Sequence, residues 1–194
     1  MILDEGIGYG GIMAVPPDGG RLHPQGIADV GIDDQPIEGK RGTGTAGVGI
    51  QSLDVVLTRY RAAVDRKREL VPNFVVMAQC YVAEAVKGGF EESLVRMKAY
   101  EEIAEVDWVQ LTVPCSVEQM RRARDAAEGP FSIIQAYMDP LPSNEELFNL
   151  GINLPCGCPG LPTMCSSTTS SKIPWSEAPA PGMTSRNSIR RTHT

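Results

Sequence analysis

The sequence predicts an α/β fold built around a parallel β-sheet. Short apolar runs alternate along the chain with longer stretches in which apolar residues recur at helical spacing, which is the pattern of consecutive βα units. The first apolar run leads directly into acidic residues and a glycine-rich turn. The chain has 194 residues, of which 42% are hydrophobic, so it can bury one core and we expect one folded domain.

The expected strands are the apolar runs, each bounded by turn-forming or helical segments. Runs of this kind suit strands that are buried on both faces of a parallel sheet. The last run is weaker than the others. In chain order the expected strands cover residues 1–4, 28–32, 74–79, 107–112, 131–136 and 151–154.

The clearest expected helix covers residues 52–70. Ser52 can cap its N-terminus, Asp54 suits the positive end of the helix dipole, and Pro72 ends the segment. Its apolar residues fall on one helical face. The same pattern predicts further helices over residues 91–104, 117–127 and 144–150.

Six strands with interposed helices predict most of a (β/α)8 barrel, a fold that in complete form needs about 200 residues or more. Residues 14–25, between the first two strands, contain adjacent prolines and adjacent glycines, which disfavour a connecting helix. From residue 165 the composition shifts to Ser, Thr and Pro without periodicity. We therefore expect a barrel domain over residues 1–164 and a disordered tail over residues 165–194.

Charge and composition exclude several classes of partner. A net charge of −6 and a pI near 5.0 argue against binding to nucleic acid or to an anionic membrane. No apolar run approaches the roughly 18 residues that span a bilayer, and no secretion signal is seen at the N-terminus. Five scattered cysteines fit a reduced chain. The expected compartment is the cytoplasm or the mitochondrial matrix.

Three short motifs carry the functional information. The first is the strand and glycine turn of residues 2–11, the second is Asp33-Asp34-Gln35, and the third is Lys40-Arg41-Gly42. Glycines let backbone amides approach an oxyanion closely. Carboxylates at consecutive strand ends beside such a turn suit a hard divalent cation with an oxo-acid bound to it. Simpler explanations exist, in which the acidic residues cap loops or form a solvated turn pair and Tyr9 is a core aromatic.

In this order the motifs resemble those of the isocitrate lyase/phosphoenolpyruvate mutase superfamily, which includes methylisocitrate lyase and carboxyvinyl-carboxyphosphonate phosphorylmutase-like proteins. Its members carry a strand close to D-A-D-T-G-Y-G-G, a strand ending in E-D-Q or E-D-K, and a mobile loop K-R-C-G-H. The resemblance covers about residues 2–164. It implies a truncated (β/α)8 TIM-type barrel that lacks the first two βα units. Because family members assemble as tetramers, it also implies a homo-oligomer.

The resemblance implies a Mg²⁺ ion bound at the strand ends together with the substrate. Asp4 matches the metal-bound Asp of the family, whereas the second acidic position of that strand falls on Gly6. Asp33 replaces a Glu and is the second expected metal residue. The expected substrate-binding residues are Tyr9, Gly10, Gly11 and Gln135.

The expected catalytic residues are Lys40, Arg41 and Gln79, and the site departs from the family pattern around them. The loop cysteine that serves the family's lyases as a general acid or base is Gly42 here. The arginine that neutralises the substrate carboxylate is Gln79, which has no charge. No acidic residue matches the family's Glu within residues 111–114.

The predicted function is a Mg²⁺-dependent lyase that cleaves a C–C bond in a small 2-hydroxy or 2-oxo dicarboxylate. Phosphonopyruvate mutases and hydrolases of the family also lack the loop cysteine, so P–C chemistry is a further alternative. The third alternative is a catalytically inert, truncated homologue, because charge is lost at several places in one site.

Overall fold

A computed structural model describes residues 2–6, 28–135, 138 and 140–157 of the chain. The glycine turn at residues 9–11, the proline-rich stretch 14–25 and the expected tail over residues 165–194 lie outside the described residues. The described elements are, in chain order, β1 (Ile2–Gly6), β2 (Asp29–Asp33), α2 (Leu53–Leu70), β3 (Val75–Cys80), the short 3-10 helix η2 (Val82–Glu84), α3 (Phe90–Glu102), β4 (Trp108–Thr112), α4 (Val117–Ala126), β5 (Phe131–Gln135), α5 (Asn144–Asn149) and β6 (Leu154–Gly157).

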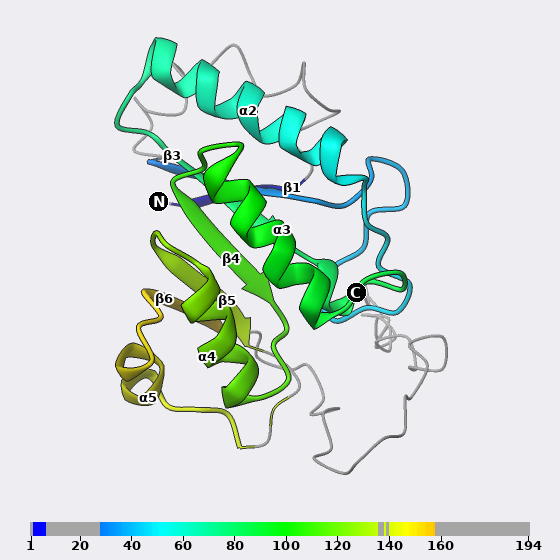
Figure 1. Cartoon of the computed structure of the whole chain (residues 1–194), viewed down its shortest axis with the longest axis vertical. Coiled ribbons are helices and arrows are strands. Elements are labelled where there is room, and N and C mark those ends of the chain that lie inside the picture. Colours follow the sequence, from blue (N-terminus) through cyan, green and yellow to red (C-terminus); the bar gives the residue numbers. More distant parts are fainter. Residues whose placement is uncertain (1, 7–27, 136–137, 139, 158–194) are drawn as a thin grey trace, which may run out of the picture.

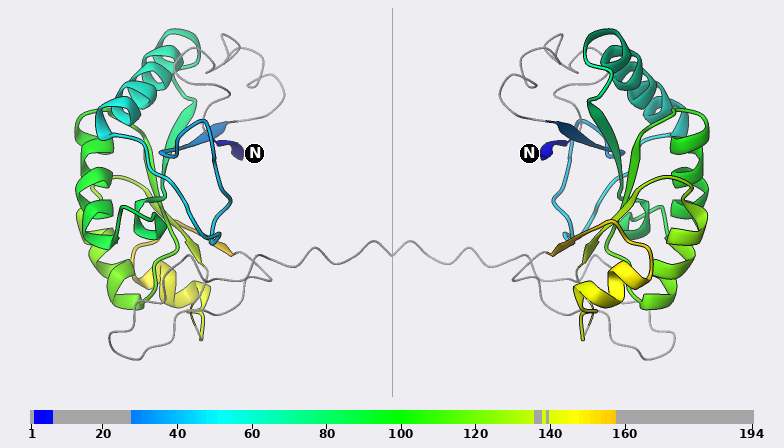
Figure 2. Two further views of the ribbon diagram at one scale, coloured as in Figure 1. Left: turned by 90° about the vertical axis from the view of Figure 1, so that its right-hand side faces the viewer. Right: turned by 90° about the vertical axis from the view of Figure 1, so that its left-hand side faces the viewer.

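The strands form one sheet in which all neighbouring pairs are parallel. They lie in chain order from β1 to β6, and helices α2, α3 and α4 cover the same face of the sheet (Figures 1 and 2). A doubly wound sheet would instead reverse its strand order and carry helices on both faces. Sequential order with helices on one face is the winding of a (β/α)8 barrel. The predicted α/β architecture, part of such a barrel, is confirmed.

Five of the six strands lie within two residues of their expected bounds, and β6 begins three residues later than expected. The shift in β6 has a local cause. Gly151 adopts a positive φ of 81°, and the buried Ile152 then donates its N–H to the carbonyl of Leu147 in α5. These residues close the helix, so pairing with β5 starts only at Leu154.

The helices follow the expected pattern and end where the backbone turns. Helix α3 stops two residues before the expected position, because Ile103 and Ala104 both donate to the carbonyl of Ala99 and Glu105 adopts a φ of 56°. Helix α5 begins with a capping box, in which Ser143 and Glu146 bond to each other's backbone N–H. None of the described helices is long and apolar enough to cross a membrane.

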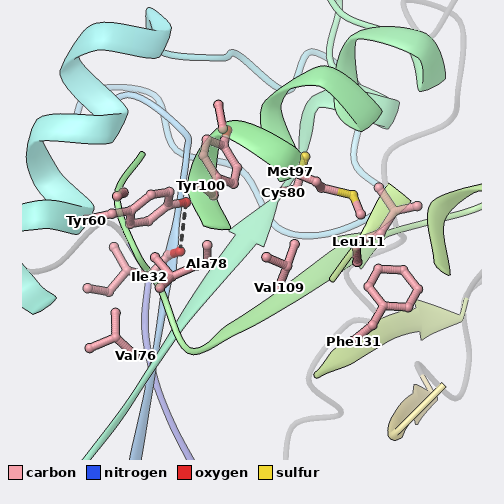
Figure 3. Close-up of a cluster of buried hydrophobic side chains, with 14 of the residues drawn as sticks. Ile32, Tyr60, Val76, Ala78, Cys80, Met97, Tyr100, Val109, Leu111 and Phe131 are labelled. Atoms are coloured by element: carbon pink, nitrogen blue, oxygen red, sulfur yellow. Dashed lines mark hydrogen bonds between the residues drawn. The ribbon is translucent and has the colours of Figure 1, made fainter. Parts of the chain in front are cut away.

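The core lies between the sheet and helices α2, α3 and α4. Alternate strand residues and the apolar faces of the helices meet there, and the rings of Tyr60 and Tyr100 contact each other edge to face, with centroids 4.9 Å apart. The hydroxyl of Tyr60 donates to the carbonyl of Ile32 at 3.1 Å, which ties α2 to β2 (Figure 3). The buried members of this core include Ile32, Tyr60, Val76, Ala78, Cys80, Met97, Tyr100, Val109, Leu111 and Phe131.

Candidate active site

Three polar residues occupy neighbouring positions near the carboxyl ends of β2, β3 and β4. The strand register pairs Asp33 with Gln79 and Gln79 with Gln110, and all three side chains are buried. Register partners in a parallel sheet point to the same face, and here it is the face opposite the helices. Two residues that the sequence assigned to the site, Asp33 and Gln79, are therefore neighbours at one rim of the sheet, where parallel barrels place their sites.

Asp33 forms an ion pair with Lys40, whose Nζ lies 2.8 Å from Oδ2. The other carboxylate oxygen accepts the backbone N–H of Gln35 at 3.2 Å. Burial raises the pKa of Asp33, and the contact with Lys40 opposes that shift. The direction of the net shift shows that desolvation of the carboxylate outweighs the attraction of the lysine. The structure thus brings together two predicted site residues that lie seven positions apart in the chain.

Gln35 explains how Lys40 reaches Asp33. The Gln35 side chain donates to the backbone carbonyl of Arg41 at 2.8 Å and accepts the backbone N–H of Arg41 at 2.9 Å. These two hydrogen bonds fix the backbone beside Lys40. Gly39 makes the preceding turn with a positive φ of 79°. The Arg41 guanidinium lies against Gly47, since a Cβ added to Gly47 would be 3.3 Å from its Nε.

The end of β2 is held from the helix side by Arg59 of α2. Its guanidinium is buried and donates to the carbonyls of Asp33 and Gln35 at 2.7 and 3.1 Å. These two carbonyls lie at the end of β2 and two residues beyond it, and the buried arginine satisfies them as hydrogen-bond acceptors. The sequence analysis did not single out Arg59.

Asp34 lies under the helices and has a structural role. Its carboxylate accepts the hydroxyl of Tyr100 at 2.7 Å and the backbone N–H of Tyr81 at 2.9 Å. Burial raises the pKa of Asp34 to about 6, and these two hydrogen bonds oppose the shift. Neither Asp33 nor Asp34 is exposed to solvent. The explanation of the two residues as a solvated turn pair is therefore wrong, because successive strand residues point to opposite, buried faces.

The second half of the loop that carries Lys40 rests on η2. Glu84 Oε2 accepts the backbone N–H of Gly44 at 2.7 Å, and the hydroxyls of Thr43 and Tyr81 lie 3.0 Å apart. Burial raises the pKa of Glu84 to about 7, while the Gly44 N–H and the Thr112 hydroxyl oppose that shift. The sequence analysis missed Glu84, since a single acidic residue in an apolar segment matches no site motif.

The amide of Gln79 is packed against β2 rather than against a charged partner. A Cβ added to Gly31 would be 2.7 Å from Gln79 Nε2, so the absence of a side chain at Gly31 makes room for this amide. Its Oε1 and the Oε1 of Gln110 are buried without a hydrogen-bond partner. Gln110 donates its Nε2 to the sulfur of Cys156 at 3.7 Å. The rim therefore presents neutral acceptor oxygens beside Asp33.

The remaining predicted residues lie at different places. Asp4 of β1 pairs with Gly31 of β2, two positions before Asp33. Strand β2 therefore lies between Asp4 and Gln79 of β3, and the β1–β2 pairing is irregular between Asp4 and Gly6. Gln135 ends β5 and donates to the carbonyl of Pro142 at 3.4 Å. By register it shares the helix-covered face of Ile133. Tyr9, Gly10 and Gly11 lie outside the described residues.

The side-chain oxygen atoms at the rim can be compared with the ligands that a metal ion requires. Among the side chains that the structure describes, no three His, Cys, Asp or Glu residues are grouped to hold one. The buried carboxylate of Asp33 and the amide oxygen of Gln79 are hard oxygen donors, and a hydrated divalent cation accepts such ligands together with water. The residues at the rim thus fit an ion that keeps several waters.

Comparison with solved structures gives strong matches, whereas no family model and no curated protein matches the sequence. Oxaloacetate acetylhydrolase in complex with the inhibitor 3,3-difluorooxalacetate matches with a TM-score of 0.72 and 29% identity. A 2,3-dimethylmalate lyase, a PEP mutase/isocitrate lyase superfamily member, matches with a TM-score of 0.72 and 28% identity. Both matches cover 80% of this chain and 52% of the solved one.

The phosphoenolpyruvate phosphomutase of Streptomyces platensis subsp. rosaceus shares the fold, with a TM-score of 0.68 at 23% identity over 80% of this chain and 53% of that one. The chain thus spans about half the length of the solved proteins it matches. The order of the site motifs, the winding of the sheet and the two matches above 25% identity agree with one another. In fold and in the order of its site motifs the chain is similar to members of the PEP mutase/isocitrate lyase superfamily.

Proposed function

We propose that this chain is a Mg²⁺-dependent lyase that cleaves a C–C bond in a small 2-hydroxy or 2-oxo dicarboxylate. The observation that carries the proposal is the ion pair of Lys40 with the buried Asp33, next to Gln79 at the carboxyl-end rim. The choice of substrate class is supported by the names of two matched proteins. One name refers to oxaloacetate, a 2-oxo dicarboxylate, and the other to 2,3-dimethylmalate, a 2-hydroxy dicarboxylate.

Asp33 and Asp4 are the residues that would hold Mg²⁺. When bound, the ion supplies positive charge that stabilises the negative charge developing on a substrate oxygen as the C–C bond breaks. Asp33 is already buried and ordered by Lys40 and by the Gln35 N–H. Because only these two carboxylates are expected near the ion, we expect weak Mg²⁺ affinity, with most of the coordination supplied by water.

The other rim residues would bind and orient the substrate. Among the described residues, the ammonium of Lys40 is the ion-pair partner of the Asp33 carboxylate, so it can attract a substrate carboxylate as well as Asp33. Gln79 offers hydrogen bonds without charge. Gly42 carries no side chain, so the proton taken up by the carbanion would come from the Lys40 ammonium or from water. We therefore expect slow turnover.

The proposal is tested on a panel of dicarboxylates by assaying pyruvate and glyoxylate release from 2-hydroxy dicarboxylates and oxalate release from 2-oxo dicarboxylates, with Mg²⁺ and with a chelator. We expect slow, Mg²⁺-dependent turnover that Asp4→Ala and Asp33→Asn abolish. Lys98→Gln is a matched control, because Lys98 pairs with Glu102 on the exposed face of α3. Brisk turnover in the presence of the chelator, or full activity of Asp4→Ala, would refute the mechanism.

The absence of a side chain at Gly42 favours a second candidate, a homologue that binds dicarboxylates without turning them over. Calorimetric binding of the same panel separates the two candidates. Binding with no product assigns the binding function, whereas product formation assigns the lyase. Phosphonopyruvate belongs in the panel, since turnover of this compound alone would assign P–C chemistry instead.

A further inference from the structure

The loop between Gly39 and Gly47, called here the 39–47 loop, carries Lys40 and Arg41. Its two end glycines have φ values of 79° and 80°, a conformation that only glycine adopts readily. Between these turning points the backbone crosses from the end of β2 to the segment that follows β3 (Figure 1). The position of Lys40 over Asp33 therefore depends on what holds this loop down.

Two sets of contacts hold it. The first half is fixed by the double hydrogen bond between the Gln35 amide and the backbone of Arg41. The second half is fixed by residues of and beside η2, where Thr43 meets the Tyr81 hydroxyl and Gly44 donates to Glu84. Beyond the loop, Val86 donates its N–H to the carbonyl of Val48 at 3.0 Å. Glu84 is the single ionisable carboxyl group among these contacts.

We propose that Glu84 is the positioning residue of the 39–47 loop: its carboxyl group holds the backbone of Gly44 and thereby keeps Lys40 over Asp33. The effect of Glu84 on turnover rests on the proposed function, whereas its effect on the loop does not. A protonated carboxyl group still accepts the Gly44 N–H through its carbonyl oxygen, so protonation leaves the contact intact.

The electrostatic surroundings of Glu84 show how its contact with the loop depends on ionisation. Glu84 is 2% exposed, and burial raises its pKa to about 7, with Asp34 at the end of β2 adding to the rise. The Gly44 N–H of the loop and the Thr112 hydroxyl of β4 oppose it. The contact with Gly44 therefore favours the ionised carboxyl group and is retained when the group is protonated.

Trypsin cleavage after Lys40 or Arg41 measures loop opening directly, because a protease cuts the opened segment. We expect Glu84→Gln to be cleaved at nearly the wild-type rate, because glutamine keeps the size and an acceptor oxygen for the Gly44 N–H.

Glu84→Ala removes the acceptor and should speed cleavage at every pH. Glu102→Gln, at an exposed glutamate of α3, should behave as the wild type. Hydrogen exchange of residues 39–47 gives a second measurement and should be faster in Glu84→Ala than in the wild type. Unchanged cleavage and unchanged exchange in a folded Glu84→Ala would overturn the proposal. Absence of turnover would bear on the proposed function alone.

Discussion

Lys40 and Asp33 meet at the carboxyl end of β2, with the ammonium nitrogen 2.8 Å from a carboxylate oxygen that is fully buried. The lysine side chain remains 33% exposed, whereas that of the aspartate is not exposed at all. Lys40 therefore contributes a charge that water still screens, whereas the buried Asp33 depends on that charge to remain ionised. The pair is the point where the loop after β2 joins the rim of the sheet.

Lys40→Met tests this dependence. Removing the ammonium leaves the desolvation of Asp33 unopposed by its principal cationic neighbour, so the pKa of Asp33 should rise further above its ordinary value. A carbon-detected NMR titration of labelled aspartate carboxyls measures the shift. The matched control is Lys98→Met, which removes a lysine from an exposed pair. An unchanged pKa of Asp33 in Lys40→Met would show that the ion pair does not persist in solution.

Gly31 and Gln79 should behave as a coupled pair. In Gly31→Ala the new Cβ would be 2.7 Å from Gln79 Nε2, and such overpacking costs typically 1–3 kcal/mol of unfolding free energy. Combining it with Gln79→Ala removes the obstructing amide, so the double variant should lose less than the sum of the two single losses. Denaturant unfolding of the four chains measures the coupling. Strict additivity would contradict the close packing of these residues.

The cost in unfolding free energy of replacing Tyr100 by phenylalanine should depend on pH, whereas the cost of replacing Tyr60 should not. Tyr100 donates to the carboxylate of Asp34, so Tyr100→Phe removes a hydrogen bond to a charged group and should cost about 1.5–3 kcal/mol at pH 7.5. Burial raises the pKa of Asp34 from 3.8 to about 6. At pH 4.5 that carboxyl is protonated in the folded chain, and the cost should fall.

Tyr60→Phe is the control for this comparison, because the Tyr60 hydroxyl donates to the neutral carbonyl of Ile32. Its cost in unfolding free energy, about 1 kcal/mol, should be the same at both pH values. For Asp34 itself, the difference between its folded and unfolded pKa values decides whether stability rises or falls with pH. A folded-state pKa above the unfolded value stabilises the fold at low pH, and this contribution is lost as pH rises from about 4 to about 6. Asp34→Asn should remove this part of the pH dependence.

Much of the fold follows from local sequence patterns. The apolar runs and the helical spacing of residues 52–70 predicted the strands and α2 closely, because burial of apolar faces decides both. The neighbouring positions of Asp33 and Gln79 were also predictable, since the carboxyl ends of parallel strands meet at one edge.

The contacts that complete the site were not predictable in this way. Lys40 reaches Asp33 because the Gln35 side chain bonds to the backbone of Arg41, and no periodic pattern encodes a side-chain bond to a loop. The buried Glu84 accepts the N–H of Gly44, which lies in a loop forty residues earlier in the chain. Such non-local contacts depend on the assembled fold, so they require the structure.

Gly42→Cys tests whether the missing loop thiol limits catalysis. Nothing lies within 4 Å of a Cβ added to Gly42, and its φ is not positive, so the substitution should leave the unfolding free energy nearly unchanged. By the resemblance to the family's lyases, the thiol would supply the general acid that the loop lacks, and general acid–base groups contribute typically 10²–10⁴-fold to rate. We expect a clear rise in lyase turnover.

Gly42→Ser is the matched control, because its hydroxyl has nearly the same size but does not ionise near neutral pH. A folded Gly42→Cys that turns over no faster than Gly42→Ser would show that the limit lies elsewhere in the site, with the uncharged Gln79 as the next residue to change.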